Sequence, residues 1–281
     1  MNKNLIRIIP KLDIKNGNLI KGINLEGLRI LGNPTNFSNI YYNHGADEIC
    51  YLDNVASLYG TNNILKFVRQ TAKNIRIPIS AGGGIRGIKD IENMLISGAD
   101  KVVINSAIVD DINFLKQAVK FFGSSTITVL VECIKFNNSR YITKSNGRDL
   151  IKLSPFDWCK KLEDNGAGEL FITSVDHEGL RSGFDIKLMK KISKNVSIPV
   201  IAHGGAGSFK QVLRVIKETH ISGVSLASLL HYSYCDYFKF KKKKIIGNYE
   251  FLLSRKKNKT KNRNVIKDLK NFLKKNKINV R

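Results

Sequence analysis

The chain has 281 residues, of which 42% are hydrophobic, and this is enough for one large α/β domain with a buried core. No run of about 18 apolar residues occurs, so we expect no membrane span. The first residues lead straight into an apolar segment without the features of a secretory signal, and the four cysteines are scattered without a CxxC pair. We therefore expect a cytoplasmic protein with reduced thiols.

The net charge of +24 is concentrated near the end of the chain. Residues 239–281 contain 17 Lys or Arg against Glu250 and Asp268, which leaves the preceding part only mildly basic. We interpret this excess chiefly as compositional drift, and secondly as an electrostatic aid for phosphorylated ligands or an acidic partner. Nucleic-acid binding is disfavoured because no recognised binding motif accompanies the charge.

Short apolar segments alternate with amphipathic ones along most of the chain. Strands are predicted at 7–13, 48–53, 77–81, 101–105, 126–131, 169–174, 199–202 and 223–227. Helices are predicted at 36–43, 63–73, 89–97, 111–122, 154–165, 186–194 and 208–219, and a last helix at 265–275. We expect residues 236–263 to be a basic loop insertion before that last helix, within a single domain covering 1–281.

Two short motifs recur at one spacing. The segment around Pro78 returns around Pro199, and the segment beginning at Gly45 returns at Gly166, both 121 residues later. A chain made of two similar halves with eight strand–helix units predicts a closed (βα)8 barrel, a TIM barrel with a two-fold half-barrel repeat.

In such a barrel, reactive groups lie at the C-terminal ends of the strands. Asp13 follows the first predicted strand and Glu132 the fifth, which are equivalent places in the two halves. Two carboxylates across a barrel mouth can form a general acid/base pair, so Asp13 and Glu132 are the catalytic candidates. Capping of the next helix is the alternative role for each of them.

Glycine-rich turns predict a phosphate site in each half. Gly84 in the first half, and Gly204 with Gly205 in the second, free backbone N–H groups near helix starts. Two further strand ends complete the pockets with Asn105, Ser106, Ala227 and Ser228. Two opposed pockets imply a substrate that is phosphorylated at both ends.

Other chemistries have weaker support. None of the cysteines lies in a glutaminase-type nucleophile elbow with a paired histidine. His203, His220 and His231 lack metal-ligand spacing and have no evident carboxylate partner, although His203 ends a strand and can reach a ligand. We expect neither a metal nor a cofactor.

Several of these segments resemble the cyclase subunit family of imidazole glycerol phosphate synthase. The resemblance is carried by 7–13, 102–106, 166–174 and 204–207, together with Lys21-Gly22, 82–86 and 45–48, and it extends over about residues 5–232 and the last helix. It implies a (βα)8 barrel that pairs with a glutamine amidotransferase and adds ammonia to a bis-phosphorylated ribotide. The products are imidazole glycerol phosphate and an aminoimidazole carboxamide ribotide of histidine biosynthesis.

The resemblance also implies residue roles. Asp13 stands at the general acid, Glu132 at the general base, and Lys21 in a mobile loop that closes over substrate. Arg7, Glu48, Lys101 and Glu169 match the charged ring at the ammonia entrance. The candidate substrate-binding residues are Lys21, Gly84, Asn105, Ser106, Thr173, Glu178, Gly179, Gly204, Gly205, Ala227 and Ser228.

The chain departs from the family at the active mouth. Glu132 and Glu178 stand where the family has Asp, His203 replaces a small residue, and the loop at 143–152 lacks the usual glycines. A paralogue that delivers ammonia for amidination of a surface-polysaccharide sugar is therefore the alternative function. A non-catalytic phosphosugar-binding barrel and a phosphoribosyl isomerase are less favoured, because neither would use an ammonia entrance.

Overall fold

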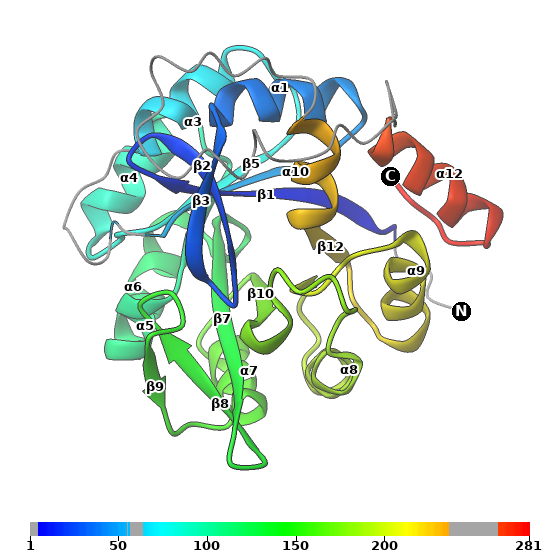
Figure 1. Cartoon of the computed structure of the whole chain (residues 1–281). Helices are drawn as coiled ribbons and strands as arrows, with labels where there is room; N and C mark the ends of the chain where they lie inside the picture. The colour runs from blue at the N-terminus through cyan, green and yellow to red at the C-terminus, as the bar shows by residue number, and fades with distance from the viewer. Residues whose placement is uncertain (1–4, 55, 57–63, 236–263) are drawn as a thin grey trace.

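Eight parallel strands close into a barrel (Figure 1). The structure is a computed structural model, and it describes residues 5–54, 56, 64–235 and 264–281. In order around the ring, the strands are β1 (Arg7–Lys15), β4 (Ile49–Asp53), β5 (Ile79–Gly82), β6 (Lys101–Ile104), β7 (Ile127–Phe136), β10 (Glu169–Ser174), β11 (Val200–His203) and β12 (Gly223–Leu226). The pairing of β12 with β1 closes the ring, so the predicted (βα)8 barrel is confirmed.

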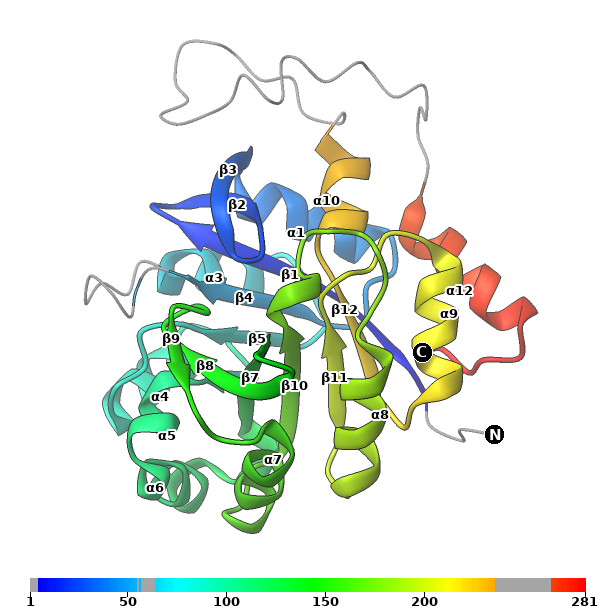
Figure 2. The same ribbon diagram turned by 60° about the horizontal axis from the view of Figure 1, so that its bottom comes forward.

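Helices cover the outside of the barrel, as Figures 1 and 2 show. They are α1 (Pro34–Asn43), α3 (Ile64–Ala72), α4 (Ile88–Ile96), α6 (Ile112–Phe122), α7 (Pro155–Asp164), α8 (Ile186–Asn195), α9 (Phe209–Glu218) and α12 (Val265–Lys275). Each matches a predicted helix to within a few residues. Two shorter helices, α5 (Ser106–Asp110) and α10 (Ser228–Tyr234), were not predicted, because so few residues leave no readable periodicity.

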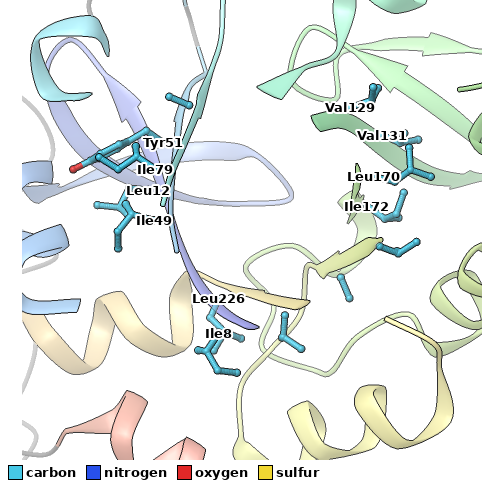
Figure 3. Packing of buried hydrophobic residues seen from close by; sticks show 14 of the residues in the cluster. Ile8, Leu12, Ile49, Tyr51, Ile79, Val129, Val131, Leu170, Ile172 and Leu226 are labelled. Atoms are coloured by element: carbon cyan, nitrogen blue, oxygen red, sulfur yellow. The ribbon is translucent and has the colours of Figure 1, made fainter. Parts of the chain in front are cut away.

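The main hydrophobic core lies between the strands and these helices. Along each strand alternate side chains point outward, and the outward set is almost entirely apolar. Figure 3 shows part of it, with Ile8 on β1 near Leu226 of β12, and Leu170 and Ile172 of β10 near β7. Because the helices cover these side chains, the eight strands read as nearly continuous apolar runs in the sequence.

Antiparallel strands extend the barrel at the mouth formed by the C-terminal ends of its parallel strands, the upper mouth. β2 (Asn18–Ile23) pairs with β1 and with β3 (Glu26–Gly32), and β8 (Ser139–Lys144) pairs with β7 and with β9 (Asp149–Ile151). Lys21, which the family resemblance assigns to a mobile loop, lies within β2 and is buried. The expected loop at 143–152 likewise contains the end of β8 and all of β9.

The two halves repeat in backbone geometry as well as in sequence. Gly83 and Gly204 are 121 residues apart and have φ angles of 109° and 100°. A Cβ atom on Gly83 would lie 2.4 Å from the carbonyl oxygen of Asp53, and one on Gly204 would lie 2.7 Å from that of Ser174. Those two carbonyls are also 121 residues apart, so the same turn is built twice and requires glycine both times.

The last described helix completes the outer layer next to the first strand. In Figure 2, α12 lies beside α9, and the segment that follows it returns to the lower end of β1. Ile6 forms a parallel bridge with Val280, and Lys270 Nζ lies 2.6 Å from Asp47 Oδ1. The expected insertion at 236–263 lies outside the described residues. None of the described helices is both long and apolar enough to cross a membrane.

The α4 helix allows a matched test of this outer core. Ile91 is fully buried against the barrel, whereas Ile96 on the same helix is 69% exposed. We expect Ile91→Ala to lower the free energy of unfolding by about 2–5 kcal/mol, because it leaves a cavity in a packed layer. Ile96→Ala is the control and should change it by less than about 0.5 kcal/mol. Equal effects in urea denaturation would contradict the packing described here.

Candidate active site

Side chains that point into the barrel form layers with different chemistry. Along β1 the inward positions are Arg7, Ile9, Lys11 and Asp13, from the lower mouth to the upper one. The other strands add inward groups at the same heights. The barrel interior therefore has charged groups at both ends and an apolar layer between them.

The lower mouth carries a closed ring of four charged residues. Arg7 contacts Glu48 at 2.9 Å and also contacts Glu169, while Lys101 Nζ lies 3.3 Å from Glu48 and 2.9 Å from Glu169. Each cation thus touches both anions. This is the set that the sequence predicted for an ammonia entrance, and the structure brings all four residues together.

Arg7 and Glu169 of the ring keep their charge although both are largely buried. Burial alone would lower the pKa of Arg7, but the charges of Glu169 and Glu48 outweigh it, and the pKa is raised. Burial would raise the pKa of Glu169, but Arg7 and then Lys101 outweigh it, and the pKa is lowered. Mutual pairing is the condition under which such charges can be removed from water.

Above the ring lies a separate apolar layer inside the barrel. It is formed by Ile9, Cys50, Leu52, Val103, Leu130, Phe171 and Ile201. All seven have low exposure, and none of their side chains is charged. This layer lies between the ring and the upper mouth, and it offers a passing molecule only uncharged side chains.

The upper mouth contains a cavity of about 510 Å³. Its lining includes the first glycine turn and the ends of β6 and β7, with Gly84, Asn105, Ser106, Glu132 and Thr173 from the predicted site. Lys11, Asp53 and Arg86 also line it and were not predicted. The phosphate site predicted for the first half thus coincides with a pocket that Glu132 also lines.

Asp13 and Glu132 occupy equivalent heights in the two halves, as predicted. Asp13 pairs in register with Leu52, Glu132 pairs with Thr173, and Leu52 and Thr173 are 121 residues apart. Both carboxylates lie within their strands rather than after them, because β1 and β7 are longer than predicted. However, Glu132 lines the cavity and Asp13 is not among its lining residues.

Asp13 is in contact with Lys11, which lines the cavity. Lys11 Nζ contacts Asp13 Oδ1, and both side chains are almost fully buried. Burial would lower the pKa of Lys11, but the charges of Asp13 and Glu178 outweigh it, and the pKa is raised. Lys11 is therefore an ammonium group inside the mouth.

Glu132 is held differently, without a cation in direct contact. Its Oε2 accepts hydrogen bonds from Asn105 Nδ2 at 3.2 Å and from the Gly147 backbone N–H at 3.0 Å. Burial raises the pKa of Glu132 to about 7, opposed in part by these hydrogen bonds and by the charge of Lys11. A carboxyl group that exchanges its proton near neutral pH suits acid/base chemistry.

The second-half site has a chain of charged groups across it. Lys21 Nζ donates to Glu178 Oε1 at 2.7 Å, and His203 Nε2 lies 3.4 Å from the same oxygen. The expectation that His203 has no carboxylate nearby was therefore wrong. Burial would raise the pKa of Glu178, but Lys21 and then His203 outweigh it and hold it well below its ordinary value.

The two anion sites differ in how open they are. The second cavity measures only about 10 Å³ and is lined by Glu178, Gly179, His203, Gly204, Gly205, Ala227 and Ser228, among others. Ser228 Oγ and Ser225 Oγ in this region are buried and have no hydrogen-bond partner within the described part of the chain. The predicted residues of this half are thus assembled around a cavity much smaller than the first.

His231 and the four cysteines are titratable side chains that lie buried. His231 lies against Tyr41, with its Nδ1 2.5 Å from the hydroxyl group, and burial lowers its pKa to about 3. All four cysteines are free and buried. No group of three or more His, Cys, Asp or Glu within the described residues is arranged to hold a metal ion.

The raised pKa of Glu132 makes a prediction about stability. Because the folded protein binds this proton more tightly than the unfolded chain, the contribution of Glu132 is full below pH 4.5 and is lost as the pH rises to about 7. Relative to the unsubstituted chain, Glu132→Gln should therefore gain about 2–3 kcal/mol in free energy of unfolding between pH 4.5 and pH 8.

Urea denaturation at several pH values measures this difference. Glu92→Gln, on the exposed side of α4, is the matched control, and its difference from the unsubstituted chain should stay constant over the same range. A constant difference for Glu132→Gln as well would contradict the raised pKa.

Comparisons with known proteins agree with this geometry. A family model described as "Histidine biosynthesis protein" matches residues 7–236. An imidazole glycerol phosphate synthase subunit HisF from Legionella pneumophila is 46% identical over 207 residues, covering 73% of this chain and 98% of the relative. Proteins with the same name from Bacillus cereus (strain G9842) and Prochlorococcus marinus (strain MIT 9211) are 38% and 41% identical, over 88% and 80% of this chain and 98% and 89% of their own lengths.

These matches extend over nearly all of the barrel, including both glycine turns and the charged ring. They confirm the resemblance that the sequence motifs carried. The chain belongs to the histidine biosynthesis protein family, in the group of cyclase subunits of imidazole glycerol phosphate synthase.

Proposed function

We propose that this chain is the ammonia-dependent cyclase of an imidazole glycerol phosphate synthase in histidine biosynthesis. It converts a bis-phosphorylated formimino carboxamide ribotide to imidazole glycerol phosphate and aminoimidazole carboxamide ribotide. The observation that carries the proposal is the pairing, in one barrel, of a closed charged ring below with a carboxylate-lined cavity above. The names of the relatives support it.

Substrate binding uses both halves of the barrel mouth. One phosphate binds at Gly84, Asn105 and Ser106, where backbone N–H groups and a hydroxyl group border the open cavity. The other binds at the second turn, with Gly204 and Ser228 among its donors. Of the rest of the predicted set, Thr173 lines the open cavity and Lys21 contacts Glu178. The second site is lined by Glu178, Gly179, Gly205 and Ala227.

Ammonia enters at the opposite end, supplied by a glutamine amidotransferase partner. The ring at Arg7, Glu48, Lys101 and Glu169 excludes water while its pairs are closed, and the apolar layer favours neutral ammonia over ammonium. The relatives are named as subunits, which supports a two-protein assembly. Buried free thiols support a reducing, cytoplasmic setting.

Acid/base roles follow from the charges in the mouth. Glu132 holds and releases a proton near neutral pH, which fits it for proton transfer to and from the reacting groups. Asp13 is paired with Lys11. The roles that the family resemblance implies are Asp13 as the acid and Glu132 as the base.

Sugar amidination is the second candidate function. The replacements at Glu132, Glu178 and His203 favour it, and so does the small size of the cavity at the second glycine turn. The named relatives do not favour it, because all of those considered are imidazole glycerol phosphate synthase subunits.

The reaction can be tested with the purified chain. We expect it to release imidazole glycerol phosphate from the bis-phosphorylated ribotide when ammonium is supplied, followed by chromatography of both products. Asp13→Asn should lower turnover by about 100-fold or more while substrate affinity changes little. Tight ribotide binding without turnover by the unsubstituted chain would favour the amidination function.

The ring makes a separate prediction. Lys101→Met breaks two of the four ion pairs, so the entrance no longer excludes water or aligns with the partner's outlet. In the complex with the amidotransferase, glutamine-dependent turnover should fall by about tenfold while ammonium-dependent turnover stays nearly unchanged. Lys89→Met, on the exposed side of α4, is the control. Equal losses with both nitrogen sources would assign Lys101 to barrel stability alone.

A further inference from the structure

Lys11 lines the cavity of the upper mouth. It points inward from β1, two residues above Ile9 of the apolar layer and two below Asp13. The 510 Å³ cavity is lined by Lys11 and Glu132, and Lys11 contacts Asp13, which is not among the lining residues. A molecule in this cavity therefore lies between an ammonium group and a carboxyl group.

The surroundings of Lys11 keep it positively charged and limit where its N–H groups can point. Asp13 contacts Nζ directly, and the charges of Asp13 and Glu178 act on it. An ammonium group has three N–H donors, and no hydrogen bond from Nζ other than the one to Asp13 is formed within the described part of the chain. Donors thus remain for a group in the cavity.

We propose that Lys11 is a further catalytic residue of this site, donating from Nζ to the carbonyl oxygen that ammonia attacks, with Asp13 as the residue that positions it. The inference rests on the proposed function, because a ribulosyl group carries a ketone carbonyl. A fixed cation in a site shielded from water stabilises a developing oxyanion strongly. Asp13 in this arrangement acts through Lys11.

The step balances without a further reactant. The lone pair of ammonia forms the C–N bond while the π electrons of the carbonyl group move to oxygen, where Lys11 stabilises the negative charge. Glu132 takes a proton from the new ammonium nitrogen and returns it to the oxygen, giving a neutral carbinolamine. Glu132 then takes a second proton from the nitrogen and delivers it to the hydroxyl group, which leaves as water while the nitrogen lone pair forms the C=N bond of a neutral imine.

Kinetics with ammonium as nitrogen donor test the proposal. Lys11→Met keeps the length of the side chain and removes the charge, so kcat should fall by about 100-fold or more with a much smaller change in KM. Lys11→Arg keeps a cationic donor and should restore at least about a tenth of the activity. Lys89→Met is the surface control. Near-normal kcat in Lys11→Met would overturn the proposal.

A double variant tests whether Asp13 acts through Lys11. Adding Asp13→Asn to Lys11→Met should lower turnover by less than about threefold more, because the residue that Asp13 positions is already gone. Multiplying losses would mean that Asp13 acts on the substrate independently. The double variant also removes the unpaired buried carboxylate of Lys11→Met, so it keeps the test open if the single variant does not fold.

A lysine could instead attack the ketone and form an imine. This requires a neutral amine, whereas Lys11 is held as an ammonium group with a raised pKa. Borohydride treatment during turnover should therefore leave Lys11 unmodified. Trapping of substrate on Lys11, together with an inactive Lys11→Arg, would overturn the proposed role.

A titration without substrate separates this inference from the proposed function. Glu132 is faced by Lys11 and Asp13 of β1, by Asn105 and by the Gly147 N–H, and the Lys11 charge lowers its pKa. In Lys11→Met, the Glu132 carboxyl signal in NMR should therefore shift its midpoint upward by at least about half a pH unit. Glu132→Gln assigns the signal.

The outcomes are distinct. If the unsubstituted chain does not convert the ribotide but the midpoint shifts, the proposed function fails and the facing pair of Lys11 and Glu132 stands. If the chain converts the ribotide and Lys11→Met is as active, the inference about Lys11 fails alone. An unchanged midpoint also overturns it, because Lys11 would then not face Glu132.

Discussion

Charge that is buried inside the barrel must be paired, and this constraint organises the whole interior. At the lower mouth, two cations and two anions form a closed ring, and at the upper mouth Lys11 pairs with Asp13 and Lys21 with Glu178. Removing one member of such a pair strands a charge in a poorly solvated place. Glu132 is the exception among these carboxylates, since only hydrogen bonds hold it and its pKa is raised. The group without a cation in contact is the group whose proton is free to move.

The architecture was readable from the sequence because its signals repeat. Parallel strands covered on both faces are apolar throughout, so all eight were found, and the 121-residue spacing identified the barrel. What the sequence did not reveal is the antiparallel extension at the upper mouth. β2 and β9 are only six and three residues long and mix apolar with polar residues. Lys21 of β2 contacts Glu178, which is far along the chain, and sequence spacing does not encode that contact.

The sequence predicted which residues form the site better than it predicted how they are arranged. The ring and the equivalence of Asp13 and Glu132 followed from matched positions, and the structure assembles them. Lys11 was missed although the alternation of Arg7, Ile9, Lys11 and Asp13 along one strand places it inside the barrel. The same alternation places both Lys11 and Asp13 inside the barrel. Only the folded structure shows that Lys11 lines the cavity and that Asp13 does not. The contact of His203 with Glu178 depends on side-chain placement that spacing does not encode.

Closure of the ring through β1 and β12 also has a consequence for how the chain is made. Arg7 and its neighbour Ser222 are separated by 215 residues, so the first strand leaves the ribosome long before the strand that completes its second edge. Until then the nascent chain exposes an unpaired apolar strand edge, which is a site for incorrect association. Contacts of such long range slow the final folding step. The charged ring draws on β1, β6 and β10, and the barrel that holds these strands closes only when β12, which ends at Leu226, has been made.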